Sequence, residues 1–134
     1  MTNRIYVANA VSNNVTVING VDNTFTTVTD PNASGPSAIA VNPVTNKIYV
    51  ANRGSGNVTL IDGTSNATTT ISVGSTPDAV TVNPVTNKVY VANENSTNVT
   101  VIDGAANTVI TNSRRGKSAL CRGGEPGQRP DLCG

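Results

Sequence analysis

The tetrapeptide Tyr-Val-Ala-Asn occurs three times in this chain, and this repetition constrains the fold more than any other feature. The copies are Tyr6–Asn9, Tyr49–Asn52 and Tyr90–Asn93, so they begin 43 and 41 residues apart. Each copy follows Thr-Asn, a basic residue and then Ile or Val, so the repeated unit is longer than four residues. A period of this length with strand-like content is typical of β units that stack or radiate, because none of them can bury its faces alone.

Short segments rich in β-branched and aromatic residues predict four strands per unit, separated by turns that contain Pro, Asn and Gly. In the second unit Pro43 and Asn46 mark one turn and Asp62-Gly63 marks another. The predicted strands of the second unit are 37–41, 47–51, 58–61 and 68–73. Those of the third unit are 79–82, 88–92, 99–102 and about 108–111, and those of the first are 4–8, 15–18 and 24–28.

This pattern predicts an all-β fold of β-propeller-type blades, each a four-stranded antiparallel sheet. About three consecutive blades form an open arc, because a propeller needs roughly four to eight blades to close. Both faces of the predicted strands carry apolar residues, which indicates packing against a neighbour on each side. We expect the most buried residues to include Val41, Val50, Ile61, Val82, Val91 and Ile102, with Tyr49 and Tyr90 in equivalent places.

The chain resembles the YVTN-repeat β-propeller family over roughly residues 2–113, with Ala in place of Thr in each tetrapeptide. Two flanking motifs strengthen the resemblance. One is N-P-x-T-N-K, at Asn42–Lys47 and Asn83–Lys88, and the other is N-V-T-[VL]-I-[DN]-G, at Asn14–Gly20, Asn57–Gly63 and Asn98–Gly104. The resemblance implies surface-antigen-like, surface-layer-like or secreted prokaryotic proteins, usually with about seven blades. It also implies an interaction scaffold, because the family's molecular activity is mostly undefined.

The repeated part of the chain ends at about residue 112. Residues 1–112 are predicted to form YVTN-type repeats, in units of about 1–35, 36–76 and 77–112. Residues 113–134 match nothing upstream and are expected to be disordered. Reading the codons from Cys121 to Cys133 one nucleotide out of frame permits A-V-A-V-N-P-V-[NS]-D-R-I-Y-V, which parallels Ala38–Val50. We therefore interpret the tail as an out-of-frame translation of a further blade, with a genuine basic tail as the alternative.

Composition excludes several kinds of function. The chain has no His, so a Ser-His or Cys-His nucleophile pair is impossible. Residues 1–113 contain four basic and six acidic residues, a net charge of −2, so no basic face for nucleic acid is expected. Cys121 and Cys133 lack further Cys or His partners for a zinc site. No run of 18 apolar residues exists that would predict a membrane span.

Few residues are candidates for a functional site. Arg53 and Glu94 lie in the variable loop after Tyr-Val-Ala-Asn, where a repeat protein often places recognition, so they are candidate partner-binding residues. Asp62 and Asp103 recur at one repeat position, with Asn19 there in the first unit. A ring of carboxylates for calcium is one interpretation of that position, and turn chemistry before Gly is the preferred one. The Asn-Val-Thr triplets are interpreted as structural rather than as glycan acceptors.

These observations predict a non-catalytic propeller module that is not an enzyme, with no catalytic residues, cofactor or metal. It is expected to be a fragment of a larger surface or secreted propeller that binds an unknown protein or cell-surface partner. Nucleic acid and a membrane span are not expected, and self-association through open blade faces is. Two alternatives stay open, namely a fragment of a lactonase-like or quinoprotein-like propeller enzyme, and a non-functional truncated product. No signal peptide precedes the repeat, so the compartment is undetermined, although the family resemblance implies an extracellular or cell-surface parent.

Overall fold

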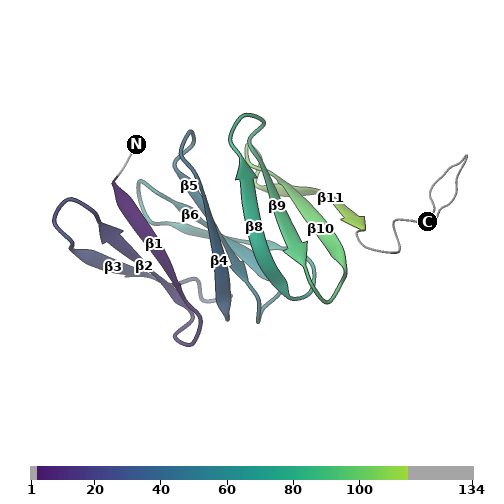
Figure 1. Ribbon diagram of the computed structural model, residues 1–134, viewed down its shortest axis with the longest axis horizontal. Coiled ribbons are helices and arrows are strands. Elements are labelled where there is room, and N and C mark those ends of the chain that lie inside the picture. The colour runs from purple at the N-terminus through teal and green to yellow at the C-terminus, as the bar shows by residue number, and fades with distance from the viewer. Residues whose placement is uncertain (1–2, 115–134) are drawn as a thin grey trace, which may run out of the picture.

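The computed structural model describes residues 3–114, and every regular element in that span is a β-strand. The strands form three antiparallel sheets, here called blades 1, 2 and 3, which stand side by side in chain order (Figure 1). Blade 1 has the strands β1 (Arg4–Asn9), β2 (Asn14–Asn19) and β3 (Phe25–Val28). Blade 2 has β4 (Pro36–Asn42), β5 (Lys47–Asn52), β6 (Asn57–Asp62) and β7 (Thr68–Ser72). Blade 3 has β8 (Pro77–Asn83), β9 (Lys88–Asn93), β10 (Asn98–Asp103) and β11 (Thr108–Arg114).

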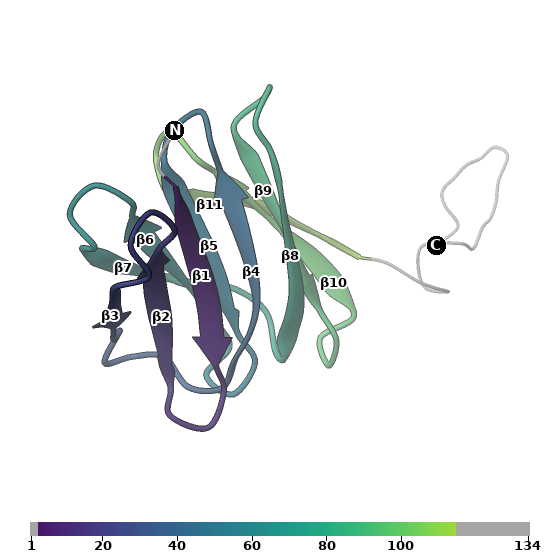
Figure 2. The ribbon, with the colours of Figure 1, turned by 60° about the vertical axis from the view of Figure 1, so that its left-hand side comes forward.

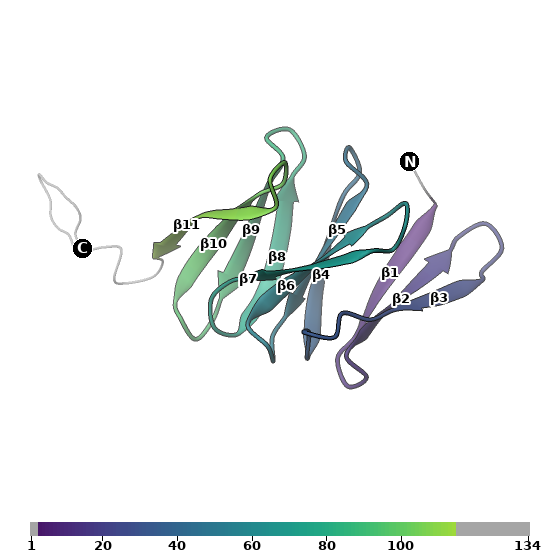
Figure 3. The ribbon, with the colours of Figure 1, turned by 180° about the vertical axis from the view of Figure 1, so that it is seen from behind.

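The blades radiate from their first strands, as in a propeller. The strand order follows the chain order within each sheet, so β4 and β8 are edge strands of blades 2 and 3. These two edge strands lie side by side, with β1 next to β4 (Figure 2). The outer strands β3, β7 and β11 fan apart when seen from behind (Figure 3), because each sheet twists. The arrangement confirms the predicted all-β fold of propeller-like blades in an open arc.

The predicted strands agree with the observed ones to within about two residues, apart from the last. β11 runs through Arg114, three residues beyond its predicted end. Positions 113 and 114 therefore have regular structure, contrary to the expectation for 113–134. The rest of that segment, including Cys121 and Cys133, lies outside the described residues.

Left-handed asparagines close several of the loops. Asn46 and Asn87 have φ of 56°, and Asn66 has φ of 62°, in the region that Asn tolerates better than most residues. The Asp62-Gly63 pair does not form a two-residue hairpin, because β6 ends at Asp62 and β7 begins at Thr68. Gly63 is needed for close approach instead, since its N–H donates to the Asn46 carbonyl at 2.9 Å and an added Cβ would collide with the Asn46 side chain.

Each blade has two different faces, because side chains alternate across a strand. We call the face toward the preceding blade the N-side face and the face toward the following blade the C-side face. One core cluster joins the C-side face of blade 1 to the N-side face of blade 2, and its buried members are Val15, Val17, Val28, Ile48, Val50 and Ile61. The other joins the C-side face of blade 2 to the N-side face of blade 3 through Tyr49, Val58, Leu60, Ile71, Val89, Val91 and Ile102.

Most of the predicted core is confirmed, and two positions are not. Val50, Ile61, Val91 and Ile102 are fully buried. Val41 is 45% exposed, although it shares the N-side face with Ile48. Blade 1 has no strand equivalent to β4 among the described residues, so nothing there covers Val41. Its equivalent in blade 3, Val82, is partly buried because blade 2 covers it.

Tyr49 and Tyr90 occupy equivalent places, as expected, but the two side chains differ in burial. Tyr49 is 0% exposed and Tyr90 is 37% exposed. The two residues occupy the same strand position, opposite Leu60 in blade 2 and Val101 in blade 3. Tyr90 belongs to the C-side face of blade 3, which no described blade covers.

Candidate functional site

The loops of the molecule gather at two ends. We call the end that contains the blade-to-blade connections the upper rim, and this end lies at the bottom of the view in Figure 1. Its loops follow β1, β3, β5, β7 and β9, and they span residues 10–13, 29–35, 53–56, 73–76 and 94–97. The lower rim holds the loops 20–24, 43–46, 63–67, 84–87 and 104–107. The polar and ionisable groups that contact one another across blades lie mostly at the upper rim. We therefore regard the upper rim as the candidate functional site.

Arg53 and Glu94 meet at this rim. The Arg53 Nη2 atom lies 2.8 Å from Glu94 Oε1, which joins the loops of blades 2 and 3. Each loop is held to the connection beside it, because the Arg53 N–H donates to the Gly35 carbonyl and the Glu94 N–H donates to the Thr76 carbonyl, both at 2.9 Å. The two side chains are 54% and 50% exposed, so the pair contributes only about 0–1 kcal/mol to stability and stays accessible to a ligand.

A polar cluster underlies the upper rim in every blade, and it explains the Asn of the repeated tetrapeptide. This Asn is buried in blades 2 and 3 and partly buried in blade 1. In blade 2 the Asn52 Nδ2 group donates to Asn57 Oδ1 and to Thr59 Oγ1, both at 2.9 Å. Asn9 makes the same two bonds in blade 1 and Asn93 makes them in blade 3. The repeated Asn, Asn-Val-Thr and their spacing are thus structural, as the sequence predicted for the Asn-Val-Thr triplets.

Asp30 extends the cluster of blade 2, and sequence reasoning missed it. This carboxylate is 5% exposed. Its Oδ2 atom accepts from the hydroxyls of Thr59 at 2.8 Å and Thr70 at 2.7 Å, and its Oδ1 atom accepts from the Asn32 N–H at 2.9 Å. The residue lies in the connection between blades 1 and 2, where the repeat lengths differ, so no repeat position marked it.

In blade 3 the hydroxyl of the equivalent threonine has a different hydrogen-bond acceptor. The Thr100 hydroxyl donates to Asn112 Oδ1 at 2.6 Å, and Asn112 lies opposite Thr100 on β11. In blade 2 the residue opposite Thr59 is Thr70, which is a hydroxyl donor to Asp30. Blade 3 therefore carries its own acceptor, whereas blade 2 takes one from the preceding connection.

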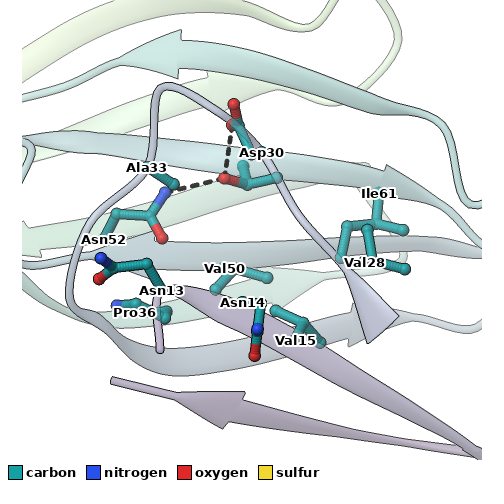
Figure 4. Close-up of a pocket in the computed structure, with 11 residues that line it drawn as sticks. Asn13, Asn14, Val15, Val28, Asp30, Ala33, Pro36, Val50, Asn52 and Ile61 are labelled. Atoms are coloured by element: carbon teal, nitrogen blue, oxygen red, sulfur yellow. Dashed lines mark hydrogen bonds between the residues drawn. The ribbon is translucent and has the colours of Figure 1, made fainter. Parts of the chain in front are cut away.

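A cavity of about 10 Å³, room for roughly one water molecule, lies beneath Asp30 at the blade 1–blade 2 interface (Figure 4). Its lining includes the polar residues Asn13, Asn52 and Thr59 and the apolar residues Val50 and Ile61. The connection over it is fixed by the Ala33 N–H, which donates to the Asp30 carbonyl at 3.0 Å. The cavity is too small for an organic substrate, so we assign it to the support of the rim.

The recurring Asx position lies at the lower rim and serves the turns. Asp62 Oδ1 accepts from the Thr64 N–H at 2.9 Å, and Asp103 Oδ1 accepts from the Ala105 N–H at 3.0 Å. Asn19 Oδ1 accepts from the Val21 N–H in the same way. Within residues 3–114 no group of three or more His, Cys, Asp or Glu side chains is arranged to hold a metal ion. The structure supports the turn interpretation of this position.

A phenol is buried between blades 2 and 3. The Tyr49 hydroxyl is enclosed and has no hydrogen-bond partner among the described residues, and the same holds for Tyr6 at the preceding interface. Burial raises the pKa of Tyr49 above its usual 10.0, with a smaller contribution from the Asp103 carboxylate. The side chain therefore stays neutral and acts as core.

Comparison with known proteins gives one family match. A family model described as "Lactonase, 7-bladed beta-propeller" matches residues 1–115. No match to a curated protein was found. In the part of the chain that the structure describes, no helix is long and apolar enough to cross a membrane.

Two solved structures illustrate the fold. The chain superposes on Kuenenia stuttgartiensis hydrazine synthase with a TM-score of 0.75 and 24% identity, over 82% of this chain and 32% of the other. It superposes on a chain of a nidogen/laminin complex with a TM-score of 0.69 and 11% identity, over 84% and 43%. The chain thus spans less than half of either, and at these identities the likeness extends to the fold alone.

The family match corrects one expectation. The sequence predicted a chain that is not an enzyme, because His is absent and no catalytic cluster is apparent. The matched family is an enzyme family, so that prediction is wrong. A complete catalytic cluster need not lie within a chain that spans only part of the solved structures it superposes on, so its absence did not exclude an enzyme family.

Proposed function

The chain belongs to the lactonase family of seven-bladed β-propellers, and we propose that it supplies three adjacent blades of a ring that hydrolyses lactones. Lactone hydrolysis adds water to the ring carbonyl carbon and breaks the bond between that carbon and the ring oxygen. The ring oxygen takes up a proton, and the product is a hydroxy acid. The reaction needs a base for the attacking water and a donor for the oxygen that becomes negative.

The Arg53–Glu94 pair is the observation that supports this proposal. In this assignment the Glu94 carboxylate accepts a proton from water, and the Arg53 guanidinium donates hydrogen bonds to the lactone carbonyl oxygen. The two groups are in contact at 2.8 Å, so one small substrate can reach both. Both are about half exposed, so a ligand can displace their mutual contact at small cost.

The upper rim holds Arg53 and Glu94 in fixed positions. Backbone hydrogen bonds hold the Arg53 and Glu94 loops to the connections that precede β4 and β8. The buried clusters of Asn52 and Asn93 lie directly before these two residues in sequence. These contacts position the charged pair, so the fold does not depend on the Arg53–Glu94 contact itself.

The test measures acid release from a five-membered aldonolactone with the purified chain in a pH-stat. We expect hydrolysis above the buffer rate, and Glu94→Gln should lower the added rate by roughly 100-fold, the usual scale of general base catalysis. Arg53→Ala should lower it to a similar degree. Asp22→Asn changes an exposed carboxylate on the lower rim and should leave the rate unchanged. A rate equal to buffer, or one that Glu94→Gln does not alter, would contradict the proposal.

We also infer a finer identity for the repeat. The three Tyr-Val-Ala-Asn copies and their Asn–Thr hydrogen bonds support YVTN-type repeats over 1–112, in units of about 1–35, 36–76 and 77–112. An extracellular or cell-surface location follows from that resemblance. The out-of-frame origin of the tail is part of the same proposal. Sequencing the gene tests it, because the shifted frame should encode Asn-Pro-Val and then Ile-Tyr-Val.

A further inference from the structure

Each junction between two described blades holds a polar pocket at the lower rim, which lies at the top of the view in Figure 1. The pocket between blades 1 and 2 has a volume of about 140 Å³, and the pocket between blades 2 and 3 has a volume of about 230 Å³. We call them the first and the second junction pocket. Both have room for a small ligand, whereas the cavity beneath Asp30 holds roughly one water molecule.

The two pockets are equivalent, because corresponding residues of successive units line them. The lining of the first junction pocket is Arg4, Val17, Asn19, Thr24, Thr26 and Asn66. In the same order, the lining of the second is Lys47, Leu60, Asp62, Ala67, Thr69 and Asn107. In each pocket the preceding blade supplies all of these residues except the asparagine at the end, which comes from a loop of the following blade. The pocket is thus a repeated feature of the junction.

The following blade contributes a free amide group to each pocket. Asn66 and Asn107 have φ of 62° and 58°, in the left-handed region that Asn tolerates. The Oδ1 atom of each is enclosed and has no hydrogen-bond partner among the described residues. The Nδ2 group is therefore the polar end of the side chain that is open to the pocket, where it is a donor for a ligand.

A basic side chain forms part of the wall of each pocket. Arg4 Nη1 donates to the Gly63 carbonyl at 2.5 Å, which anchors the guanidinium at the junction and leaves its other N–H groups available. A guanidinium presents paired donors that match two oxygens of a carboxylate, sulfate or phosphate group. Lys47 takes the place of Arg4 in the second junction pocket.

The recurring Asx position gives the two pockets different charges. In both units its Oδ1 atom serves the turn, because Asn19 accepts from the Val21 N–H and Asp62 accepts from the Thr64 N–H, both at 2.9 Å. The remaining polar atom is an Nδ2 donor in Asn19 and a carboxylate oxygen in Asp62. The lining of the first junction pocket therefore contains a cation and no acidic residue, whereas that of the second contains one of each.

One carboxylate lies near the first junction pocket without lining it. Asp22 Oδ1 accepts from the N–H and the hydroxyl of Thr24, at 3.0 and 2.7 Å. Asp22 is exposed, so water and salt screen its charge. It therefore opposes an anion in the pocket less than a carboxylate in the lining does.

We propose that the first junction pocket binds a small oxyanion, such as sulfate or the carboxylate of a small acid. The donors are the Arg4 guanidinium, the Asn66 Nδ2 group and the Thr26 hydroxyl, with Asn19 Nδ2 beside them. The second junction pocket rejects the same anion because of the Asp62 carboxylate. The Asx position thus sets the charge of the ligand at each junction. The site lies at the rim opposite Arg53 and Glu94, and the proposal does not depend on the hydrolytic activity.

Titration of the full chain with sodium sulfate tests the site by amide nuclear magnetic resonance, with ionic strength held constant by sodium chloride. We expect saturable shifts of the Thr26 and Asn66 signals, with a dissociation constant in the millimolar range. Arg4→Gln removes the cation and should weaken binding by about tenfold. Lys88→Gln makes the same change of charge at the equivalent position of blade 3, outside both pockets, and should leave the affinity unchanged.

An exchange at the Asx position is the decisive arm. Asn19→Asp gives the first junction pocket the charge of the second and should weaken sulfate binding by about tenfold. Asp62→Asn makes the opposite change and should add saturable shifts at Asn107. Each introduced side chain occurs at this position in another unit and makes the same turn bond there, so both variants should fold.

Three results would overturn the proposal. The first is a wild-type chain without saturable shifts at Thr26 and Asn66, and the second is binding that Arg4→Gln or Asn19→Asp leaves unchanged. The third is equal sulfate binding by the two junction pockets, either in the wild-type chain or because Asp62→Asn adds nothing at Asn107.

Discussion

Strands β5 and β9 share the tetrapeptide Tyr-Val-Ala-Asn but differ in their surroundings. In β5 the tyrosine and the valine are both 0% exposed. In β9 Val91 is fully buried, whereas Tyr90 is 37% exposed. Blade 2 has a neighbour on each side, and blade 3 has a described neighbour on its N-side face alone. The difference teaches that the repeat specifies how a blade is built, and that the neighbouring blade decides which of its residues become core.

Blade 1 shows the opposite asymmetry. Val15 and Val17 on its C-side face are buried against blade 2, and Val7 on its N-side face is 40% exposed. An equivalent position therefore contributes to stability in one blade and little in another. A buried copy of a residue and its exposed copy, substituted in the same way, therefore isolate the contribution of burial to stability.

The largest expected effect concerns an isoleucine at the start of the repeated strand. Ile48→Ala should lower the free energy of unfolding by about 4 kcal/mol, because Ile48 is fully buried between blades and its loss leaves a cavity. Ile5→Ala, at the equivalent 47% exposed position, should cost less than about 1 kcal/mol. Urea unfolding measures both losses. Equal losses would show that the blades are equally buried.

Asp30 distinguishes the two internal interfaces. Asp30→Ala should cost about 3 kcal/mol, because the Thr59 and Thr70 hydroxyls lose a buried charged acceptor. Val73→Ala at the other interface removes apolar contacts instead and should cost about 1 kcal/mol. Thermal unfolding shows which of the two variants loses more stability. A smaller loss for Asp30→Ala would mean that water replaces the carboxylate in the cavity beneath it.

The asparagine of the tetrapeptide should show a moderate effect. Asn52→Ala should cost about 2 kcal/mol, because Asn52 is 1% exposed and bonds both Asn57 and Thr59. Asn9→Ala removes the same two bonds in a partly exposed blade and should cost about half as much. Chemical denaturation measures the difference. A cost that is the same in both would indicate that hydrogen bonding alone, without burial, sets the value of this residue.

The smallest expected effect is the removal of a hydroxyl. Tyr49→Phe should change stability by less than about 1 kcal/mol at pH 7, because the Tyr49 hydroxyl has no partner in the described structure. The raised pKa means that the folded state holds the phenol proton more tightly than the unfolded state. The stability from neutral Tyr49 is thus complete below pH 10 and is lost as the pH rises from the usual 10.0 toward the folded value.

A pH series of thermal unfolding from 8 to 11 checks this sign. The wild-type chain should lose stability above pH 10, and Tyr49→Phe should lose less. Tyr90→Phe alters an exposed phenol and should follow the wild type. A wild-type curve that is parallel to that of Tyr49→Phe would contradict the buried, neutral tyrosine.

The strands could be predicted because strand content and repetition are local properties of the sequence. Val50 and Ile61 were placed correctly in the core for that reason. Val41 was misplaced because its burial requires a blade 1 strand equivalent to β4. The described residues contain no such strand, and the residues near Val41 do not report this. Tyr90 was placed correctly as the equivalent of Tyr49, and its greater exposure has a similar origin at the other end of the arc. Burial in a repeat protein is a property of the stack, and a single repeat cannot report it.

The candidate site was predicted only in part. Arg53 and Glu94 were selected as loop residues, and their pairing follows from equal positions in successive units, a signal that was present in the sequence. Asp30 had no such signal, because it lies in a connection whose length differs from that of its equivalent. The enzymatic character of the family had no signal in the residue types, since the chain lacks His.

Asp30 also fixes the order in which similar units can stand along the chain. Blade 2 needs an acceptor from the connection before it, whereas blade 3 supplies its own through Asn112. If blades 2 and 3 were exchanged, the Asp30 carboxylate would face a threonine that already has an acceptor, and it would lose its second hydroxyl donor. A buried charge that loses hydrogen-bond donors is costly, so the exchanged order would be less stable. The connection thus matches blade 2 specifically, although the strands of blades 2 and 3 are nearly interchangeable in sequence.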